Sequence, residues 1–309
     1  MTDEKIVFVT GGTGFIGRHA VHALLRSGYE VHVASRSYQG PFAPSPLMRI
    51  HECDLFDGDH LRRLLTMIQP THLLHLAWET EPGAYWNSPH NVQWIEASLK
   101  LLREFTAGGG QRAVFAGSCA EYDSSAGRCD EIATPLRPAS LYGACKSALQ
   151  QVVAEYTRTT GMTAAWARLF HIYGPGEHER PFVPSIVRAL LADQPAICRH
   201  GAHVRDYLHV HDVGDALTAL LESDVTGPVN VASGQAVTLD EMATRLAAAA
   251  GCGSVKSEAG QPTPDNPPEI SAVTERLRNE VGWSPSITLD EGLRSVVKTM
   301  RQRRHTRAA

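Results

Sequence analysis

The sequence lacks the features that mark several large classes of protein. No apolar run approaches the roughly 20 residues that a membrane-spanning helix needs. The first residues, MTDEKIVFVTGG, are acidic and lead at once into a strand pattern, unlike a signal peptide. A net charge of −4 and a pI near 6.4 provide no basic surface for nucleic acid. We therefore expect a cytoplasmic globular protein that binds neither membrane nor nucleic acid.

Patterns for disulfides and metals are also missing. The six cysteines are scattered and include no C-x-x-C pair, which predicts reduced thiols. The fifteen histidines include no H-E-x-x-H motif. His209 and His211 flank a valine in strand-like sequence, where alternate side chains point to opposite faces. The sequence therefore predicts no metal site.

The chain does contain apolar strand runs that alternate with helical stretches. Strands separated by helices require parallel crossovers, so we predict an α/β fold with a Rossmann-type doubly wound sheet. The predicted strands are Ile6–Thr10, Glu30–Ser35, His51–Asp54, Leu73–Ala77, Arg112–Ala116 and Thr163–Leu169. Beyond Arg168 the pattern loosens around helical stretches at 238–250 and 289–300. We predict a cofactor domain over 1–168, with a return segment near 206–233, and an interleaved substrate-binding region over 169–309.

The first strand runs into a glycine-rich turn, TGGTGFIG at 10–17, and then into a helical stretch. In this position Gly11 can form a tight turn, Gly14 lets a pyrophosphate approach the backbone, and Gly17 allows close packing of helix on strand. The helix N-terminus adds free N–H groups and partial positive charge. The turn therefore predicts a dinucleotide cofactor.

The end of the second predicted strand bears on which dinucleotide binds. NAD enzymes usually place Asp or Glu there to accept hydrogen bonds from the ribose. This chain has Ser35 and Arg36 instead. A guanidinium can pair with the 2′-phosphate of NADP, although Arg36 as a solvated surface residue is the alternative. We expect NADP.

A candidate for proton transfer lies further along the chain. Tyr142 and Lys146 are four residues apart and share one face of a helix. An ammonium beside a phenol lowers the phenol's pKa toward working pH. Ser118, at the end of a predicted parallel strand, can hydrogen-bond the same substrate oxygen. A Y-x-x-x-K spacing alone would more often be structural, but together with Ser118 and the glycine turn it predicts catalysis.

A series of motifs in this order and spacing resembles the extended short-chain dehydrogenase/reductase family, whose members are nucleotide-sugar epimerases, dehydratases and reductases. The resemblance runs nearly end to end. The motifs are TGGTGFIG at 10–17, Asp54-Leu55, HLAW at 75–78, Asn91, GS at 117–118, YGACK at 142–146, RLFHIYGPG at 168–176, RDYLHVHDV at 205–213, NVASG at 230–234 and GWSP at 282–285.

The resemblance implies a role for individual residues and a nucleotide-diphosphate sugar as substrate. Ser118, Tyr142 and Lys146 would be catalytic. The cofactor would contact Gly11, Gly14, Phe15, Ile16, Gly17, Ser35, Arg36, Asp54, Leu55, Leu76, Ala77, Tyr142 and Lys146. The substrate would contact Trp78, Glu79, Cys119, His171 and Arg205. Without the resemblance, Arg205 beside Asp206 would be interpreted as a surface ion pair. Many relatives dimerise through two helices, here 91–107 and 141–159, so we expect a homodimer.

Three departures from the family pattern bear on the reaction. The 4,6-dehydratases carry acidic residues directly after the Ser or Thr, whereas this chain has Cys119 and Ala120, which argues against dehydration. Glu121, expected to face away from Ala120 in extended chain, is interpreted as a packing or hydrogen-bonding residue. His171 stands where Asn is common. Trp78, Tyr85 and Trp86 predict either a shaped pocket around a hexose or a cover over the core.

The leading hypothesis is NADPH-dependent reduction of a nucleotide-diphospho-4-keto-6-deoxyhexose at C4, a subgroup suggested by GSCAEYD and AWETEPG. The first alternative is an NAD(P)-dependent nucleotide-sugar epimerase. The second is a non-catalytic NADP-binding regulator, against which the intact trio of Ser118, Tyr142 and Lys146 argues. The nucleotide and the stereochemistry of the sugar are left open.

Overall fold

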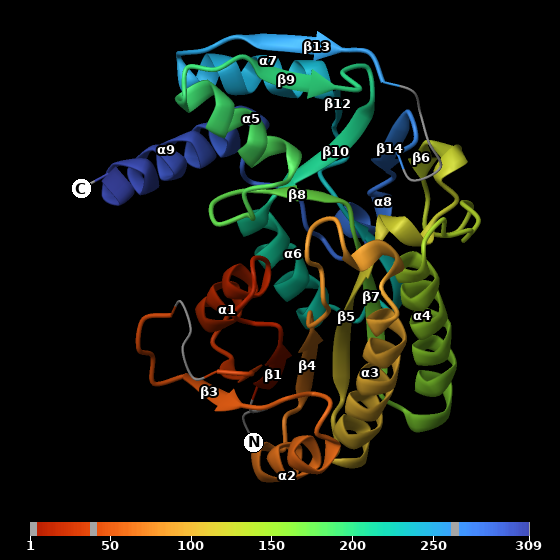
Figure 1. The fold of residues 1–309 in the computed structure, drawn as a ribbon. Coiled ribbons are helices and arrows are strands. Elements are labelled where there is room, and N and C mark those ends of the chain that lie inside the picture. Colours follow the sequence, from red (N-terminus) through yellow and green to blue (C-terminus); the bar gives the residue numbers. More distant parts are fainter. Residues whose placement is uncertain (1–4, 38–41, 261–265, 309) are drawn as a thin grey trace.

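The computed structural model describes residues 5–37, 42–260 and 266–308, with side chains as far as residue 304. Its main body is a seven-stranded sheet of order β11-β7-β5-β4-β1-β2-β3, in which all neighbouring strands are parallel (Figure 1). The predicted doubly wound α/β fold is confirmed. The strands are β1 Ile6–Thr10, β2 Glu30–Ser35, β3 Met48–Glu52, β4 His72–His75, β5 Arg112–Ser118, β7 Thr163–Leu169 and β11 Gly227–Val231.

Helices cover both faces of this sheet and bury its apolar side chains. Helices α1 and α6 pack on one face together with the apolar residues of β1, β2, β7 and β11. Helices α2, α3 and α4 pack on the other face, around Phe8, Phe115 and Trp166. The helices are α1 Gly17–Arg26, α2 Gly58–Ile68, α3 His90–Ala107, α4 Leu141–Thr160 and α6 Val210–Glu222.

Three strand predictions were shifted at their ends. β3 starts at Met48 rather than His51, because Met48 and Ile50 pack against the core of the α1 face. β4 ends at His75, two residues before the predicted end. β5 continues to Ser118, because its pairing with β7 extends to the partners Ser118 and Leu169. The last shift places Ser118 at the carboxyl edge of the sheet.

Most of the remaining elements form a smaller region above the large sheet (Figure 1), whereas α8 packs on β11, with Leu277 in the core of the large sheet. Helices α5, α7 and α9 enclose a third apolar core, which includes Met242 and Leu293. β10 joins the regions: it pairs with β8, β12 and β14, and α6 follows it back to the large sheet. The elements are β6 Arg128–Cys129, β8 His171–Tyr173, α5 Phe182–Leu191, β9 Ala196–Arg199, β10 Val204–His209, β12 Ala236–Thr238, α7 Leu239–Ala250, β13 Val255–Glu258, β14 Glu269–Ala272, α8 Glu275–Asn279 and α9 Leu289–Ala308.

The prediction that His209 and His211 point to opposite faces was wrong. β10 ends at His209, which caps α6, and His211 is already helical. Their rings stack with centroids 5.4 Å apart. Even so, no group of three or more His, Cys, Asp or Glu side chains within the described ranges is arranged to hold a metal ion. None of the described helices combines the length and apolarity needed to cross a membrane.

Candidate active site

The glycine turn between β1 and α1 has the geometry that a dinucleotide requires. Gly11 has a φ of +70°, and a Cβ there would lie 2.7 Å from the backbone nitrogen of Ala77. A Cβ at Gly17 would overlap the Gly11 carbonyl, so only glycine lets α1 start this close to the turn. Gly14 is exposed, and a Cβ there would meet protein only at the Gly11 oxygen, 3.2 Å away. Gly14 therefore faces open space into which a ligand can fit.

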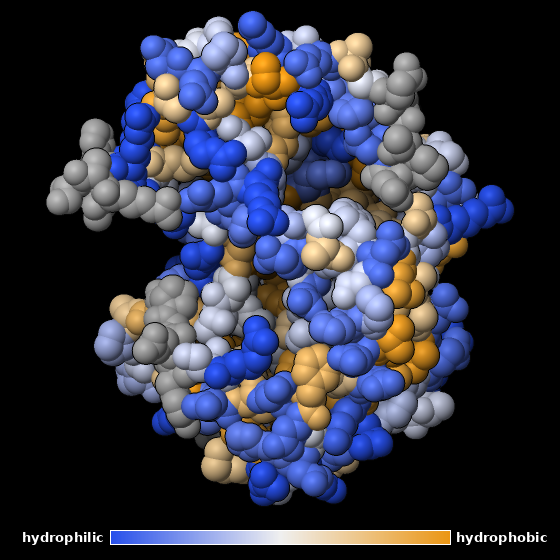
Figure 2. Space-filling view, viewed as in Figure 1, coloured by the Kyte–Doolittle hydropathy of each residue, from blue (hydrophilic) through white to orange (hydrophobic). Residues whose placement is uncertain are grey.

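A cavity of about 750 Å³ extends from this turn along the carboxyl ends of β1, β2 and β4. In the space-filling view, the surface is hollowed between the lobe of the large sheet and the smaller lobe above it (Figure 2). Eleven of the predicted cofactor residues line the cavity, as do two predicted substrate residues. They are Gly11, Gly14, Phe15, Ile16, Gly17, Ser35, Arg36, Asp54, Leu55, Leu76, Ala77, Trp78 and Glu79.

The end of this cavity next to β2 and β3 carries charges of both signs. Arg36 is exposed and also lines an adjoining cavity of about 490 Å³, which it shares with Glu52 and Asp57. Glu52 is the register partner of Ser35, so a carboxylate lies beside the end of β2 although β2 itself has none at that end. Asp54 accepts a hydrogen bond from the backbone N–H of Phe56 at 3.0 Å, which shapes the turn after β3.

Ser118, Tyr142 and Lys146 come together at the carboxyl end of β5. Ser140 caps the start of α4 by accepting from the N–H of Gly143. A Cβ at Gly143 would overlap the carbonyl of Ala120, so this glycine lets α4 approach the segment after β5. Tyr142 is 8% exposed and hydrogen-bonded to Ser118. Lys146 is buried and donates to the carbonyl of Ala116 at 2.8 Å.

The prediction that Lys146 lowers the pKa of Tyr142 was wrong for this arrangement. Burial raises the pKa of Tyr142 well above its usual range, and the hydrogen bond with Ser118 opposes this only in part. The Lys146 nitrogen lies 5.9 Å from the centroid of the phenol ring and turns toward Ala116 and Trp78. Burial also lowers the pKa of Lys146 to about 7. Tyr142 is therefore a protonated phenol, suited to donate a proton.

Glu121 belongs to a buried network and is not available as a catalytic acid. Cys119–Glu121 is a short 3-10 helix, not extended chain as expected. The Glu121 carboxylate accepts from the N–H of Ser118 at 2.7 Å, from Trp166 at 2.9 Å and from Arg168 at 2.8 Å. The hydrogen-bonding role expected from the sequence is thus the observed one, and it fixes the backbone of Ser118.

Three of the predicted substrate residues cluster on the side of the smaller region. Arg205 is buried and donates to the carbonyl of Pro267 at 2.8 Å and to the side chain of Asn266, not to Asp206. Its charge, after the larger effect of burial, helps lower the pKa of His171 to about 3. It also opposes the burial that raises the pKa of Cys119 to about 12. His171 is therefore neutral, and its Nδ1 is buried without a hydrogen-bond partner.

Three aromatic rings pack around Tyr142. The rings of Tyr85, Trp86 and Trp78 lie with centroids 4.9, 5.8 and 6.2 Å from that of Tyr142, each nearly perpendicular to it. Asn91, on α3, accepts from the Trp78 indole at 2.8 Å and donates to the carbonyl of Tyr85 at 2.7 Å. Trp78 also lines the cavity at the glycine turn, whereas the predicted cofactor residues Tyr142 and Lys146 do not.

Comparison with known proteins identifies the family. Residues 7–232 match the family described as NAD dependent epimerase/dehydratase. The chain belongs to this family. The resemblance to extended short-chain dehydrogenases is thereby confirmed, and the chain is a member of an enzyme family that acts with a nicotinamide dinucleotide.

Several members of this family are similar over nearly the whole chain. A UDP-glucose 4-epimerase of Corynebacterium glutamicum is 25% identical, with coverage of 94% of this chain and 93% of its own length. A UDP-glucuronic acid decarboxylase 1 of Xenopus tropicalis is 26% identical, with coverage of 97% and 73%. The structure of a UDP-glucose 4-epimerase of Thermus thermophilus in complex with NAD superimposes with a TM-score of 0.77 at 27% identity, covering 96% and 99%.

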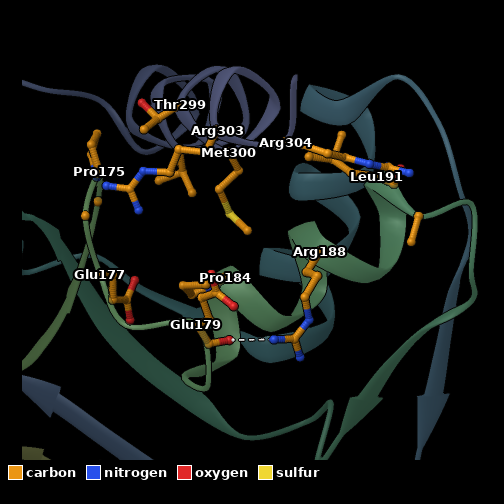
Figure 3. A pocket seen from close by; sticks show the side chains of 14 residues that line it. Pro175, Glu177, Glu179, Pro184, Arg188, Leu191, Thr299, Met300, Arg303 and Arg304 are labelled. Atoms are coloured by element: carbon orange, nitrogen blue, oxygen red, sulfur yellow. Dashed lines mark hydrogen bonds between the residues drawn. The ribbon is translucent and has the colours of Figure 1, made fainter. Parts of the chain in front are cut away.

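A second cavity, of about 400 Å³, lies apart from the residues that the sequence predicts for the active site (Figure 3). Segment 174–179, α5 and α9 enclose it, and Glu177, Arg188, Met300 and Arg303 are among its lining residues. Burial raises the pKa of Glu177 to about 8, and one of its carboxyl oxygens has no hydrogen-bond partner. None of the residues given a catalytic, cofactor or substrate role from the sequence lines this cavity, although Gly174, Pro175 and Gly176 of the RLFHIYGPG motif do.

Some residues of the site were missed from the sequence. The spacing Ser118-x-x-Glu121 is that of a capping box, and this signal would have placed Glu121 against the backbone of Ser118. Asn91 was noted as a motif residue, but nothing local indicated that it would hold Trp78. Likewise, no short-range pattern indicates that Asn266 and Pro267 bind Arg205, because 61 and 62 positions separate them from it in the chain.

Proposed function

We propose that the protein is an NAD(P)-dependent epimerase of a nucleotide-diphosphate hexose. It would invert the configuration at one hydroxyl-bearing carbon of the sugar, C4 in our hypothesis. The observation that carries this proposal is the cluster of Ser118, Tyr142 and Lys146, whose lysine contacts Trp78, a residue that lines the cavity at the glycine turn. The two positions directly after Ser118 hold Cys119 and Ala120, which are not acids. Such a site can move a hydride and a proton reversibly at one carbon. Cys119 and Ala120, at the positions where dehydratases carry acidic residues, cannot provide the acid that would expel water from the neighbouring carbons.

The cavity residues fit a dinucleotide. Gly11, Gly14 and Gly17 form a cradle that a Cβ at Gly11 or Gly17 would fill, and the N-terminus of α1 has no side-chain cap, which leaves its N–H groups for a pyrophosphate. The adenosine end would lie against Arg36 and Asp54. A nicotinamide dinucleotide held by these residues would supply the reversible exchange of a hydride with the sugar carbon.

The residues of the chain would handle the proton and the orientation of the sugar. Tyr142 in its phenolate form would take the proton of the C4 hydroxyl during oxidation, and the resulting phenol would return it to the same oxygen during reduction. Ser118 hydrogen-bonds that oxygen, and the ammonium of Lys146, which donates to the carbonyl of Ala116 in the structure, would have to turn toward the phenol oxygen to stabilise the phenolate. The raised pKa of Tyr142 favours the proton-donating half of the cycle. Arg205 and neutral His171 would orient the diphosphate and the sugar.

The names of the relatives support epimerisation more than the reduction that the sequence suggested. The epimerase of C. glutamicum matches this chain along 93% of its length, and the epimerase of T. thermophilus, bound to NAD, along 99%. Both relatives invert a sugar carbon according to their names. Glu121, the nearest acidic residue in sequence to Ser118, is held by Arg168 and Trp166, which opposes a dehydratase.

A second candidate is the NADPH-dependent reduction of a nucleotide-diphospho-4-keto-6-deoxyhexose at C4. Arg36 at the end of β2, where β2 has no carboxylate, favours it. Glu52 and Asp57 on the adjoining cavity oppose a 2′-phosphate by their charge. We keep NADP as the proposed cofactor of this second candidate. The third hypothesis, a non-catalytic regulator, has no feature of the described residues in its favour.

Two further parts of the proposal concern assembly. We infer that residues 1–168 with 206–233 form the cofactor domain and that the rest of 169–309 binds the sugar nucleotide. We also infer a homodimer through α3 and α4, on which Val92 and Val152 expose 47% and 45% of their surface. Two such helices from each protomer would form a four-helix bundle.

The decisive experiment incubates the purified protein with a panel of nucleotide-diphosphate hexoses, with and without added NAD, NADP, NADH and NADPH, and identifies the products by NMR. An epimerase converts one C4 epimer to the other without net change in absorbance at 340 nm, and deuterium placed at C4 stays in the product. A reductase instead consumes NADPH in proportion to a 4-keto substrate. No turnover in either assay, with a folded protein, would reject both candidates.

A further inference from the structure

The ammonium of Lys146 contacts two groups of different kind. It donates to the carbonyl of Ala116 at 2.8 Å, and it lies 3.7 Å from the centroid of the Trp78 ring system. The distance places the cation against the face of the indole, within the range at which the quadrupole of the ring attracts a cation. Glu121 also attracts Lys146, but its carboxylate is bound by other donors. Trp78 is therefore a direct neighbour of the lysine that the proposed reaction needs.

Trp78 is itself held in place. Its indole N–H donates to Asn91 at 2.8 Å, and its ring stacks on Trp94 with an interplanar angle of 25°. The amide of Asn91 is 2% exposed and also donates to the carbonyls of Tyr85 and Ser88, so its position is determined from three sides. The indole face is thus presented to Lys146 by a fixed support rather than by a freely rotating side chain.

The contact opposes a cost that burial imposes. Lys146 is 3% exposed, and burial lowers its pKa to about 7, so its charged and neutral forms have similar free energies at neutral pH. An aromatic face stabilises a desolvated cation and does not stabilise a neutral amine in the same way, so it raises the pKa of the lysine. From the usual strength of such contacts, the effect is roughly 0.5 to 1.5 pH units.

We propose that Trp78 is a positioning residue, which holds the ammonium of Lys146 beside Tyr142 through a cation–π contact of its indole face. The consequence for turnover rests on the proposed function, whereas the contact does not. Trp78 contacts this ammonium and also lines the cavity that the dinucleotide would occupy. The aromatic residue after the HLA motif would then tune the lysine as well as line the sugar pocket.

The test measures the pKa of Lys146 directly. The chain has only five lysines, so protein labelled with ¹³C-lysine gives few signals, and Lys146→Met assigns the one of interest. Trp78→Phe keeps an aromatic face without the indole N–H, and Trp78→Leu removes the face but keeps an apolar side chain. We expect the pKa of Lys146 to change little in the first variant and to fall by roughly 0.5 to 1.5 units in the second.

Trp86→Leu is the matched control. Trp86 belongs to the same aromatic group at Tyr142, but the cation–π partners of Lys146 among the described residues are Trp78 and Tyr142, not Trp86. It should leave the pKa of Lys146 unchanged. If Trp78→Leu does not fold by circular dichroism, Trp78→Met replaces it, since an unbranched thioether fills the space with less strain. An unchanged or increased pKa in the Leu or Met variant, or an equal fall in Trp78→Phe, would overturn the proposal.

Turnover is measured separately and distinguishes the contact from the proposed function. If the pKa of Lys146 falls in Trp78→Leu while no sugar nucleotide is converted even by the unaltered protein, the contact stands and the proposed function fails. If the function holds, the high-pH limb of kcat should move to lower pH in Trp78→Leu by the same amount as the pKa. A purely structural role would lower kcat without moving this limb.

Discussion

Replacing Glu121 by glutamine tests whether this carboxylate is structural. Glu121 is fully buried and Arg168 is 1% exposed, and the two are joined at 2.8 Å. Glutamine has the same shape but no charge, so the guanidinium would be left buried without its counter-ion. At an effective dielectric constant of about 20, the attraction at this distance is about 6 kcal/mol. Removing one partner of a buried pair is expected to lower the free energy of unfolding by about 3 to 5 kcal/mol.

The assay is thermal unfolding followed by calorimetry. With an unfolding entropy of about 2.1 cal/mol/K per residue, a chain of this length has about 0.65 kcal/mol/K in total. The expected loss therefore lowers Tm by roughly 5 to 8 °C. Glu155→Gln is the control, because Glu155 forms an ion pair with Arg158 in which the side chains are 70% and 72% exposed. An exposed pair of this kind contributes about 0 to 1 kcal/mol, so its Tm should fall by less than about 2 °C.

Activity separates this role from that of a catalytic acid. Below its unfolding transition, Glu121→Gln should retain most of the turnover of the original enzyme, because the carboxylate acts on the backbone of Ser118 and not on substrate. A variant with unchanged Tm and abolished turnover would refute the argument and would reopen an acid–base role for Glu121. Equal losses of Tm in Glu121→Gln and in the control would refute the estimate of the buried pair.

The site allows four other predictions. Tyr142→Phe should lower kcat by roughly 10²–10⁴-fold and leave dinucleotide affinity nearly unchanged in a fluorescence titration, because only the proton-transfer group is lost; equal affinity loss and turnover loss would contradict this. Gly14→Ala should fold and bind the dinucleotide more weakly, whereas Gly17→Ala should fail to fold stably, as circular dichroism and the same titration would show. Arg36→Ala should weaken NADPH at least about tenfold more than NADH if a 2′-phosphate is bound there; an equal effect on both would remove the case for NADP. Burial lowers the pKa of Lys146 from 10.5 to about 7, so unfolding takes up a proton between pH 7 and pH 10.5. The contribution of Lys146 to the free energy of unfolding should therefore grow as pH rises through this interval, which the midpoints of urea unfolding would show. Lys146→Met should abolish that growth.

The fold was predictable because its signals are local. Strand β1, the glycine turn and α1 follow one another between Ile6 and Arg26, and each glycine has a steric reason that the sequence order reveals. The ends of β3 were less predictable, since Met48 joins the strand through packing against residues distant in the chain. Arg205 shows the same limit, because its partners at Asn266 and Pro267 reach it only through the tertiary fold.

The chemistry of Tyr142 shows what spacing alone cannot determine. Residues four apart on a helix share a face, but the flexible chain of Lys146 carries its ammonium to the carbonyl of Ala116 and the face of Trp78. The phenol is therefore governed first by burial, which keeps it protonated, and next by Ser118. A protonated phenol donates readily to a ketone oxygen, whereas taking a proton from a hydroxyl requires the ammonium of Lys146 close to the phenolate oxygen. The oxidative half of the proposed cycle therefore depends on Lys146 more than the reductive half does, and Trp78, which holds that ammonium, should affect oxidation more than reduction.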